Sequence, residues 1–263
     1  MFSVNTQLRL AAVALGVVLG LSATSMALAA GEQKTPAGVS WSFNGPFGTF
    51  DRAQLQRGFK VYREVCSACH GLEKLAFRNL MQPGGPEFSE EETKVIAAEY
   101  LVMDGPDDFG DMFERDGGLP DKFPPAFPND NAARAANGGA YPPDFSVIAK
   151  ARKYGPDYLN ALLIGYTEPP ADVDAGDKYY NPYFAGGLIS MAPPLDDGLV
   201  EYTDGTPELL ENYAEDVSAF LMWTAEPKLE ERKRVGFQVI LFMLVLTVLL
   251  YFTKRKIWAN VDH

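Results

Sequence analysis

Two thiols and an imidazole lie within five residues of one another, at Cys66, Cys69 and His70. These are the only cysteines of the 263-residue chain, and the one other histidine, His263, is its last residue. The Cys-x-x-Cys-His spacing is typical of covalent haem c attachment, in which both thiols add to vinyl groups of the porphyrin. His70 then becomes an axial ligand of the iron. A chain with this motif is expected to wrap its other segments around one haem c.

Three other uses of the two cysteines fit less well. A structural zinc ion needs about four ligands, and the sequence has no second Cys or His cluster. A thioredoxin-like pair lies in a strand–turn–helix context and does not need the histidine. A disulfide across two intervening residues would be short and strained. The motif therefore favours haem c.

The N-terminus is typical of a secretory signal peptide. Arg9 precedes an apolar run over residues 10–21, and the small residues Ala27 and Ala29 follow. We expect cleavage after Ala29, so that residues 1–29 are a signal peptide. The alternative, a membrane anchor, is disfavoured because the apolar run is too short to span a bilayer. Export agrees with the haem motif, because bacteria attach haem c covalently outside the cytoplasm.

A helix is expected over residues 52–65, with the haem motif at its C-terminal end. Asp51 is a suitable N-cap. Gly58 lies within the apolar stripe of this helix, where a glycine costs helix stability, and we therefore expect a close helix crossing there. The stripe itself follows helical spacing and consists of Leu55, Phe59, Tyr62 and Val65.

Short helices and ordered loops are expected in the middle of the chain. Helices are predicted over residues 89–103, where Ser89 begins a capping box, over 144–152 and over 157–164. Gly- and Pro-rich loops separate them, but interleaved phenylalanines argue for order, since disordered segments are poor in aromatics. The last helix of this region is predicted to start at residues 206–208 and to end near residue 225.

An uncharged apolar stretch over residues 235–253 predicts a membrane-spanning helix. At 1.5 Å per residue it spans roughly 28 Å, which matches the hydrocarbon core. Basic clusters flank both ends, which disfavours a buried core helix. We expect a haem domain over residues 30–231, a transmembrane anchor over 232–254 and a short tail over 255–263. Because the N-terminus is exported, the haem domain is placed on the periplasmic side of the bacterial inner membrane and the tail in the cytoplasm.

The expected haem domain is strongly acidic. Residues 32–231 hold 34 Asp and Glu side chains against 16 Lys and Arg, a formal charge of −18. This sign excludes nucleic acid as a partner and attracts a basic protein. The acidic residues either form a docking face or serve only as a solvated surface, and both interpretations stay open.

The second axial ligand decides whether a haem binds substrate or mainly transfers electrons. No histidine is available, since His263 is expected across the membrane, and a methionine thioether would favour ferrous iron and raise the reduction potential. Met191 is favoured, because Pro193 and Pro194 stiffen its apolar loop. A methionine that only packs is nevertheless the commoner case. The other methionines considered for this position are Met81, Met103, Met112 and Met222.

The chain resembles the cytochrome c1 family, the membrane-anchored haem subunits of the cytochrome bc1 complex, over almost its whole mature length. Many c-type cytochromes share the haem motif. The Met-Ala-Pro-Pro block at Met191 and the Gly-Tyr-Thr-Glu-Pro-Pro block at Gly165 are far more specific. Further blocks that resemble the family lie at residues 76–80, 132–140, 142–144, 181–184, 204–207 and 225–227.

The resemblance implies a mainly α, class I cytochrome c-like haem domain with long loop insertions, followed by one C-terminal transmembrane helix. It implies that Cys66 and Cys69 form the thioethers to haem c. It also implies that His70 and Met191 are the axial ligands of the iron.

Three further positions match family residues near the haem propionates: Arg152, Tyr158 and Asn137. The implied role is that of a redox subunit, which is not an enzyme as an isolated chain, of quinol:cytochrome c oxidoreductase. It would take one electron from the Rieske iron–sulfur protein and pass it to a soluble, basic c-type cytochrome. The implied setting is a dimeric complex with cytochrome b in the lipid membrane.

Two other functions are kept as alternatives. Another membrane-anchored c-type cytochrome, such as a terminal-oxidase subunit, often carries its anchor at the N-terminus, unlike this chain. A haem peroxidase needs a vacant or labile iron site and distal acid–base residues, and the chain has no spare histidine for that purpose.

Overall fold

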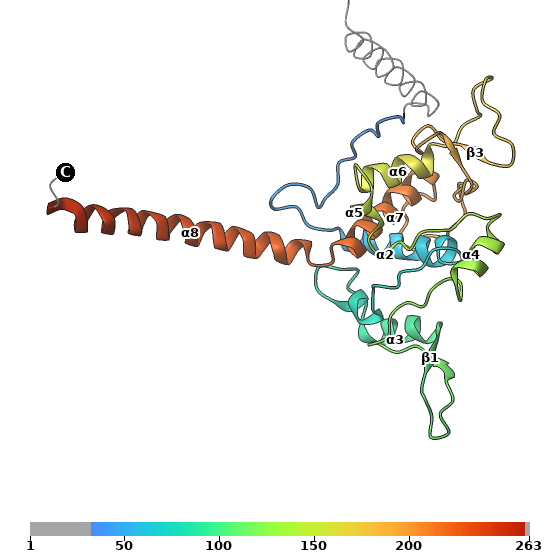
Figure 1. The fold of residues 1–263 in the computed structure, drawn as a ribbon, viewed down its shortest axis with the longest axis horizontal. Helices are drawn as coiled ribbons and strands as arrows, with labels where there is room; N and C mark the ends of the chain where they lie inside the picture. Colours follow the sequence, from blue (N-terminus) through green and yellow to red (C-terminus); the bar gives the residue numbers. More distant parts are fainter. Residues whose placement is uncertain (1–32, 261–263) are drawn as a thin grey trace, which may run out of the picture.

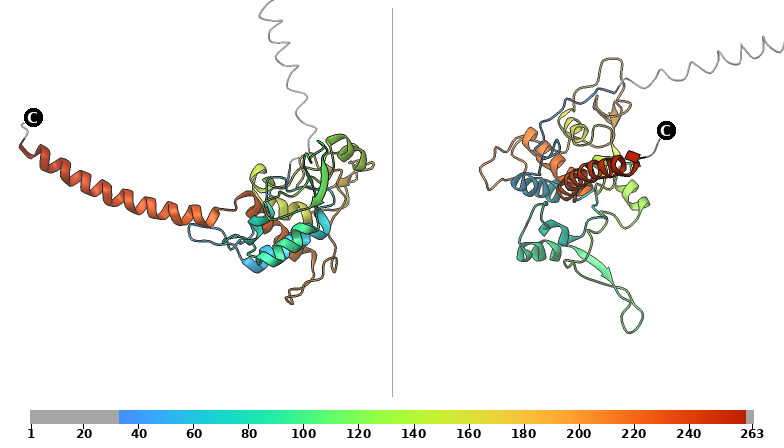
Figure 2. Two further views of the ribbon diagram at one scale, coloured as in Figure 1. Left: turned by 90° about the horizontal axis from the view of Figure 1, so that it is seen from below. Right: turned by 90° about the vertical axis from the view of Figure 1, so that its left-hand side faces the viewer.

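A computed structural model describes residues 33–260. Residues 1–32 and 261–263, which include the predicted signal peptide and the end of the predicted tail, lie outside the described residues. Short helices and long loops form a head, and one long helix, α8 (Leu229–Ile257), extends away from it (Figure 1). The two further views show the same arrangement (Figure 2). The prediction of a mainly α fold with one apolar C-terminal helix is confirmed.

Two helices, α2 (Arg52–Val61) and α7 (Leu210–Ala225), cross in the head. They can approach closely because Gly58 of α2 has no side chain. A Cβ atom at Gly58 would lie 2.1 Å from the carbonyl oxygen of Asp216 and 2.7 Å from the Cβ of Phe220. The close crossing that the sequence predicted at Gly58 is thereby confirmed.

Aromatic rings fill the core around this crossing. The ring centroid of Phe59 lies 5.6 Å from that of Phe220 and 6.4 Å from that of Phe123, and Tyr62 lies 5.9 Å from Phe220. Such ring pairs add about 0.5–1.5 kcal/mol beyond the burial of their area. Phe123 comes from the loop-rich middle of the chain and orders it as predicted, whereas Phe109 in the same region is 90% exposed.

The predicted helix over residues 52–65 changes type near its end. Asp51 caps α2 as predicted, by accepting a hydrogen bond from the N–H of Gln54 at 3.0 Å. After α2 the chain continues as a π-helical turn, η1 (Tyr62–Cys66). Such turns are frequent at functional sites, and this one leads directly into the haem motif.

The rest of the head consists of short elements joined by loops (Figure 1). In chain order they are η2 (Phe77–Met81), α3 (Glu90–Ala98), β1 (Leu101–Asp104), β2 (Phe113–Asp116), α4 (Asp130–Ala136), α5 (Ile148–Ala151), α6 (Pro156–Ile164), β3 (Tyr179–Tyr180) and β4 (Leu188–Ile189). The strands form two antiparallel pairs, β1 with β2 and β3 with β4.

The helix predicted over residues 89–103 is too long. α3 begins with the predicted capping box at Ser89, but β1 follows it. An ion pair between Arg115 and Asp104 joins the two strands of the β1–β2 hairpin. Apolar side chains of β1 remain exposed, as Met103 does at 59%. A further turn of α3 would therefore bury no additional apolar surface.

The helix predicted over residues 157–164 is confirmed as α6. The helix predicted over residues 144–152 is reduced to α5. The reason is that the Asp144 carboxylate accepts hydrogen bonds from the N–H groups of Glu73 and Ser146, which holds this segment as a loop.

The predicted helix start at residues 206–208 is wrong. α7 begins at Leu210, whose N–H donates to the Asp197 carboxylate at 2.7 Å. A side chain 13 residues away in sequence therefore does what a local N-cap was expected to do. The predicted end of this helix near residue 225 is correct.

The base of α8 is fixed to the head. Leu229 is buried, and Lys233 Nζ donates to the carbonyl oxygens of Phe43 at 2.6 Å and Gly48 at 3.0 Å. Beyond this base the apolar part of α8 buries none of its residues in the head, and η3 (Trp258–Asn260) ends the described chain. Within residues 33–260, this is the one helix long and apolar enough to cross a membrane.

Candidate haem-binding site

The haem motif forms a tight turn at the end of η1. The N–H groups of Cys69 and His70 both donate to the carbonyl oxygen of Cys66, at 3.1 and 2.9 Å. The N–H of Ser67 donates to the carbonyl oxygen of Tyr62 at 2.9 Å. Local backbone bonds therefore hold the two thiols and the imidazole in one turn.

The side chain of His70 is fixed by a loop 73 residues further along the chain. Its Nδ1 lies 2.8 Å from the carbonyl oxygen of Pro143. Phe145 stacks on the imidazole with 3.9 Å between ring centroids and 12° between ring planes. The buried Tyr62 hydroxyl donates to the carbonyl oxygen of His70 at 2.9 Å, so both the ring and the backbone of His70 are held.

These contacts set the protonation state of His70. A carbonyl oxygen only accepts, so Nδ1 carries the proton and Nε2 keeps the lone pair that binds a metal. Burial lowers the pKa of His70, and it outweighs the opposing effects of the Pro143 carbonyl and the Asp144 charge. The imidazole is therefore neutral at pH 7, as a metal ligand has to be.

The two thiols are free in this structure and form no disulfide with each other. Part of the Cys66 residue is exposed, yet burial around its thiol, and then the neighbouring Cys69, raises the pKa of Cys66 to about 12. A thioredoxin-like pair needs the opposite, a lowered thiol pKa. In the described part of the chain, no three His, Cys, Asp or Glu side chains are grouped to hold a metal ion, so a structural zinc site has no ligand set there.

Met191 follows β4 in a half-buried position. The hydroxyl of Tyr166 donates to the Met191 carbonyl oxygen at 3.1 Å. Asn181 connects the same region to α6, since its Nδ2 donates to the carbonyl oxygen of Leu162 at 2.8 Å. Met191 therefore lies on a loop that hydrogen bonds hold in place.

Two of the predicted propionate contacts lie next to each other. Burial raises the pKa of Tyr158, whereas Arg152 lies close enough to the Tyr158 hydroxyl to favour its ionised form and so to lower that pKa. Burial also raises the pKa of Tyr166, and the nearby Tyr158 adds to it. Arg152, Tyr158 and Tyr166 therefore lie near one another, and of these Tyr166 binds the Met191 segment.

Asn137 is not part of this connected group. Its Nδ2 donates to the carbonyl oxygen of Ala133 at 2.7 Å, and its N–H donates to that of Arg134 at 3.2 Å. These bonds cap the C-terminal end of α4. Its predicted position near a propionate stays a prediction.

The sequence does not indicate the role of four positioning residues. Tyr62 appears in it only as part of the apolar stripe of the helix predicted over residues 52–65. Pro143 and Tyr166 lie in blocks that resemble the cytochrome c1 family, which was the available signal, although no role was assigned to them. Phe145 carried no signal beyond its aromatic side chain, because nothing local in the sequence predicts which ring will pack against His70.

The residues present fit a haem c. Two free thiols can add to vinyl groups, and a neutral imidazole offers Nε2 to the iron. The arrangement provides what such a group needs on its protein side: a fixed nitrogen ligand, two attachment points and a fixed methionine loop elsewhere in the head.

Comparisons with known proteins agree with this interpretation. A sequence model of the Cytochrome C1 family matches residues 41–261. The cytochrome c1 of Rhodospirillum rubrum is 45% identical over 98% of this chain and 100% of its own length, and that of Blastochloris viridis is 45% identical over 94% and 95%. A protein of Bradyrhizobium diazoefficiens named cytochrome b/c1 is 51% identical over 86% of this chain, which corresponds to 36% of its own length.

Proposed function

The chain belongs to the cytochrome c1 family, and we propose that it carries one electron from a Rieske iron–sulfur protein to a soluble c-type cytochrome, with His70 and Met191 as axial ligands. Proteins of this family carry a covalently bound haem c. They are redox subunits of the cytochrome bc1 complex, which also contains cytochrome b and the Rieske protein. The electron's route and the ligand pair are the proposed part.

The observation that carries the proposal is the state of the His70 ring. Its Nδ1 proton is held by the Pro143 carbonyl at 2.8 Å, and burial keeps the ring neutral. A hydrogen bond at Nδ1 orients a histidine ligand and raises its basicity. A buried histidine with only a packing role does not need a free Nε2 next to two thiols.

The chain's own residues make the site suitable for electron transfer. Bound haem c supplies the one-electron iron couple. Cys66 and Cys69 would hold the haem covalently, and His70 and Met191 would both bind its iron, which would leave no position for a substrate. The thioether favours ferrous iron and keeps the potential high enough to accept an electron from a Rieske centre. Hydrogen bonds to both ligand segments limit the rearrangement that electron transfer requires.

Charge and the anchor helix support the proposed partners. The acidic segment over residues 32–231 attracts a basic soluble cytochrome. One relative bears the name cytochrome b/c1, which supports a place for α8 beside cytochrome b. We place the head on the periplasmic side of the bacterial inner membrane, residues 255–263 in the cytoplasm, and the chain in a dimeric complex.

Carbon monoxide tests the closed iron site directly. The reduced, purified complex is expected to show the same visible spectrum with and without carbon monoxide at neutral pH, because Met191 keeps the sixth position. Met191→Leu should bind it, and Met222→Leu, a change of the same type in α7, should not. Ready binding by the unchanged protein would exclude the His/Met pair and favour a haem enzyme such as a peroxidase.

A further inference from the structure

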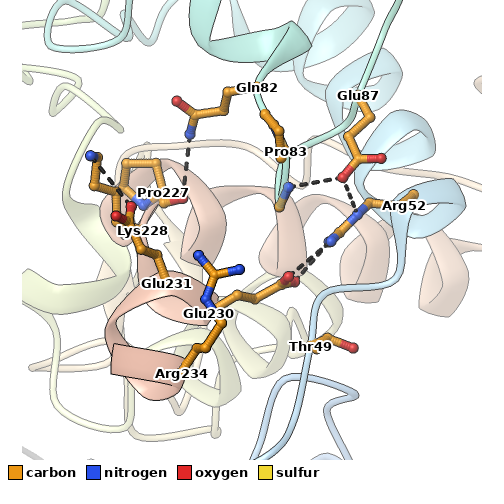
Figure 3. Close-up of a pocket in the computed structure, with 11 residues that line it drawn as sticks. Thr49, Arg52, Gln82, Pro83, Glu87, Pro227, Lys228, Glu230, Glu231 and Arg234 are labelled. Carbon is orange, nitrogen blue, oxygen red and sulfur yellow. Dashed lines mark hydrogen bonds and ion pairs between the residues drawn. The ribbon is translucent and has the colours of Figure 1, made fainter. Parts of the chain in front are cut away.

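A pocket of about 580 Å³ lies at the junction of the head and the anchor helix (Figure 3). Its walls come from the start of α2, the loop that follows η2, and the base of α8. It is separate from the haem-binding site, because its lining includes none of the residues assigned to the haem. Its size is within the range of about 300–1,000 Å³ that is usual for small-molecule sites.

The walls are held in place by charged and polar contacts. The guanidinium of Arg52 binds both carboxylate oxygens of Glu230, at 2.8 and 2.9 Å, and its Nε donates to Glu87 at 2.9 Å. Glu87 also accepts from the N–H of Gly84 at 2.8 Å. Gln82 donates to the carbonyl oxygen of Pro227 at 3.3 Å. These bonds join all three segments of the lining, so the pocket is preformed.

Arg234 is a cation in the lining without a carboxylate partner. Its side chain extends from α8 toward the middle of the lining residues (Figure 3). Within the part of the chain that the structure describes, no hydrogen bond, ion pair or ring contact involves the side chain of Arg234. The nearby Glu230 is occupied by Arg52, and Glu231 lies 3.4 Å from Lys228. A guanidinium without a carboxylate partner can bind a phosphate through two parallel hydrogen bonds.

The position of Arg234 along α8 indicates where such a phosphate comes from. The next residue, Val235, begins the apolar stretch, none of whose residues is buried in the head. With that stretch in the hydrocarbon core, Arg234 and the pocket lie at the level of the lipid head groups. Exposed apolar side chains directly below, such as Phe237 (54%) and Ile240 (63%), can lie along acyl chains.

The charges of the lining indicate which kind of lipid head group fits the pocket. Three basic side chains, Arg52, Lys228 and Arg234, are balanced by three acidic ones: Glu87, Glu230 and Glu231. A lining with no net charge that contains an available guanidinium and partly exposed carboxylates fits a zwitterion. The phosphodiester would bind Arg234, and a primary ammonium would bind Glu87 or Glu231.

We propose that the pocket between α2, the loop after η2 and the base of α8 binds the head group of a membrane phospholipid of the phosphatidylethanolamine type, with Arg234 as the phosphate ligand. This inference requires α8 to lie in a bilayer, and it does not depend on the identity of the axial ligands. The carbon monoxide test of the iron site and the lipid-binding test of the pocket can therefore give positive or negative results independently of each other.

Native mass spectrometry of the purified, haem-loaded complex in detergent tests the proposal. After delipidation, the complex is given dioleoyl-phosphatidylethanolamine, and the retained lipid is quantified. Arg234→Gln should reduce retention at this site at least tenfold, or about 1.4 kcal/mol. Arg232→Gln is the matched control, because Arg232 lies two residues earlier on α8, binds Glu226 and does not line the pocket. It should retain the lipid as the unchanged protein does.

Three results would overturn the proposal. One is equal retention by Arg234→Gln, and another is equal retention of dioleoylglycerol, which has the same chains but no head group. The third is displacement of the lipid by inorganic phosphate at equal concentration, which would show a site for free phosphate. If Arg234→Gln assembles poorly, Arg234→Lys gives a second measurement: it keeps the charge but loses the paired hydrogen bonds, so partial retention is expected and full retention counts against the assignment.

Discussion

The imidazole of His70 is held from several directions by residues that do not carry the chemistry themselves. The Pro143 carbonyl orients Nδ1, the Phe145 ring covers the imidazole, and Tyr62 holds the backbone carbonyl. The consequence is that the direction of Nε2, the proposed ligand atom, is set before any metal binds. Pre-orientation of this kind is what keeps a redox centre from rearranging when its charge changes.

Tyr166 is expected to do for Met191 what Pro143 does for His70. Tyr166→Phe removes the hydroxyl that donates to the Met191 carbonyl oxygen at 3.1 Å, a bond worth about 1 kcal/mol. With Met191 as ligand, the reduced variant should bind carbon monoxide more readily and show a lower midpoint potential. Tyr179→Phe, an exposed tyrosine of β3, should change neither. Wild-type spectra and potential in Tyr166→Phe would mean that this hydrogen bond does not position the ligand.

At the residue scale, the sequence indicates the groups that are proposed to react but not those that orient them. Cys66 and His70 can be proposed from the sequence because their spacing is itself the chemical requirement. Pro143 and Phe145 lie 73 and 75 residues after His70 in the sequence, and no local periodicity predicts such a contact. Met191 stood out through its proline-stiffened loop, whereas the donor to its carbonyl came from another segment.

Among the secondary-structure elements, the crossing of α2 and α7 organises the head, and an ion-pair network reinforces it. Arg57 of α2 binds Asp216 of α7 at 2.7 and 3.1 Å and Asp204 at 2.8 Å. Asp216 also accepts from the Tyr202 hydroxyl at 2.8 Å. Since α2 leads into the haem motif, the crossing indirectly fixes where the motif lies.

Gly58→Ala is expected to destabilise the head. The new Cβ would lie 2.1 Å from a backbone oxygen of α7, and overpacking of this kind costs about 1–3 kcal/mol. Thermal unfolding of the haem-loaded protein should show a Tm that is several degrees lower, at about 2–4 °C per kcal/mol. Gly38→Ala, where a Cβ meets nothing within 4 Å, is the control. Equal Tm values for the two variants would show that the helices can separate without cost.

The loop before α7 is expected to make stability depend on acid pH. The N–H of Thr206 and then the Arg57 guanidinium lower the pKa of Asp204 to about 2, from an ordinary value of 3.8. Because the pKa of Asp204 is lower in the folded state, the ionised carboxylate stabilises the fold. This stabilisation is fully present above about pH 4 and is lost as the pH falls toward about 2. The Tm of the unchanged protein should therefore fall more steeply between pH 4 and pH 2 than that of Asp204→Asn. Parallel plots of Tm against pH for the two proteins would show that Asp204 does not contribute to the acid dependence of stability.

At the element scale, the helices that carry their own signals were predicted well. Asp51 starts α2 and Ser89 starts α3, both through local capping bonds. Prediction failed where a side chain outside the helix determined its first residue. The Asp197 carboxylate accepts from the first N–H of α7, and the Asp144 carboxylate accepts from the N–H of Ser146, so that α5 begins later than predicted. The β1–β2 hairpin was missed because its apolar side chains mimic the continuation of α3.

On the scale of the whole molecule, a rigid joint connects an acidic head to an apolar anchor. Leu229 is buried in the head, and Glu230 and Lys233 bind the segment that precedes α2. The anchor therefore sets the orientation of the head relative to the membrane. Such a joint keeps the proposed electron donor and acceptor sides of the haem-binding site at a defined height above the bilayer.

The charge pattern could be predicted from the sequence alone, since it depends only on composition along the chain. The height and shape of the joint could not, because they depend on contacts between the first described residues and the base of α8, such as Lys233 to Phe43. The proposed phospholipid pocket at this joint was not predicted for the same reason.

The most direct test of the central claim, a closed electron relay with His70 and Met191 on the iron, is a redox titration of the purified complex. Axial ligands tune haem potentials over a range of ~0.8 V, so Met191→Leu should lower the midpoint potential by a sizeable part of that range. Met222→Leu should leave it unchanged. An unchanged potential in Met191→Leu, with the haem still covalently bound, would contradict the account, because another residue would then hold the sixth position.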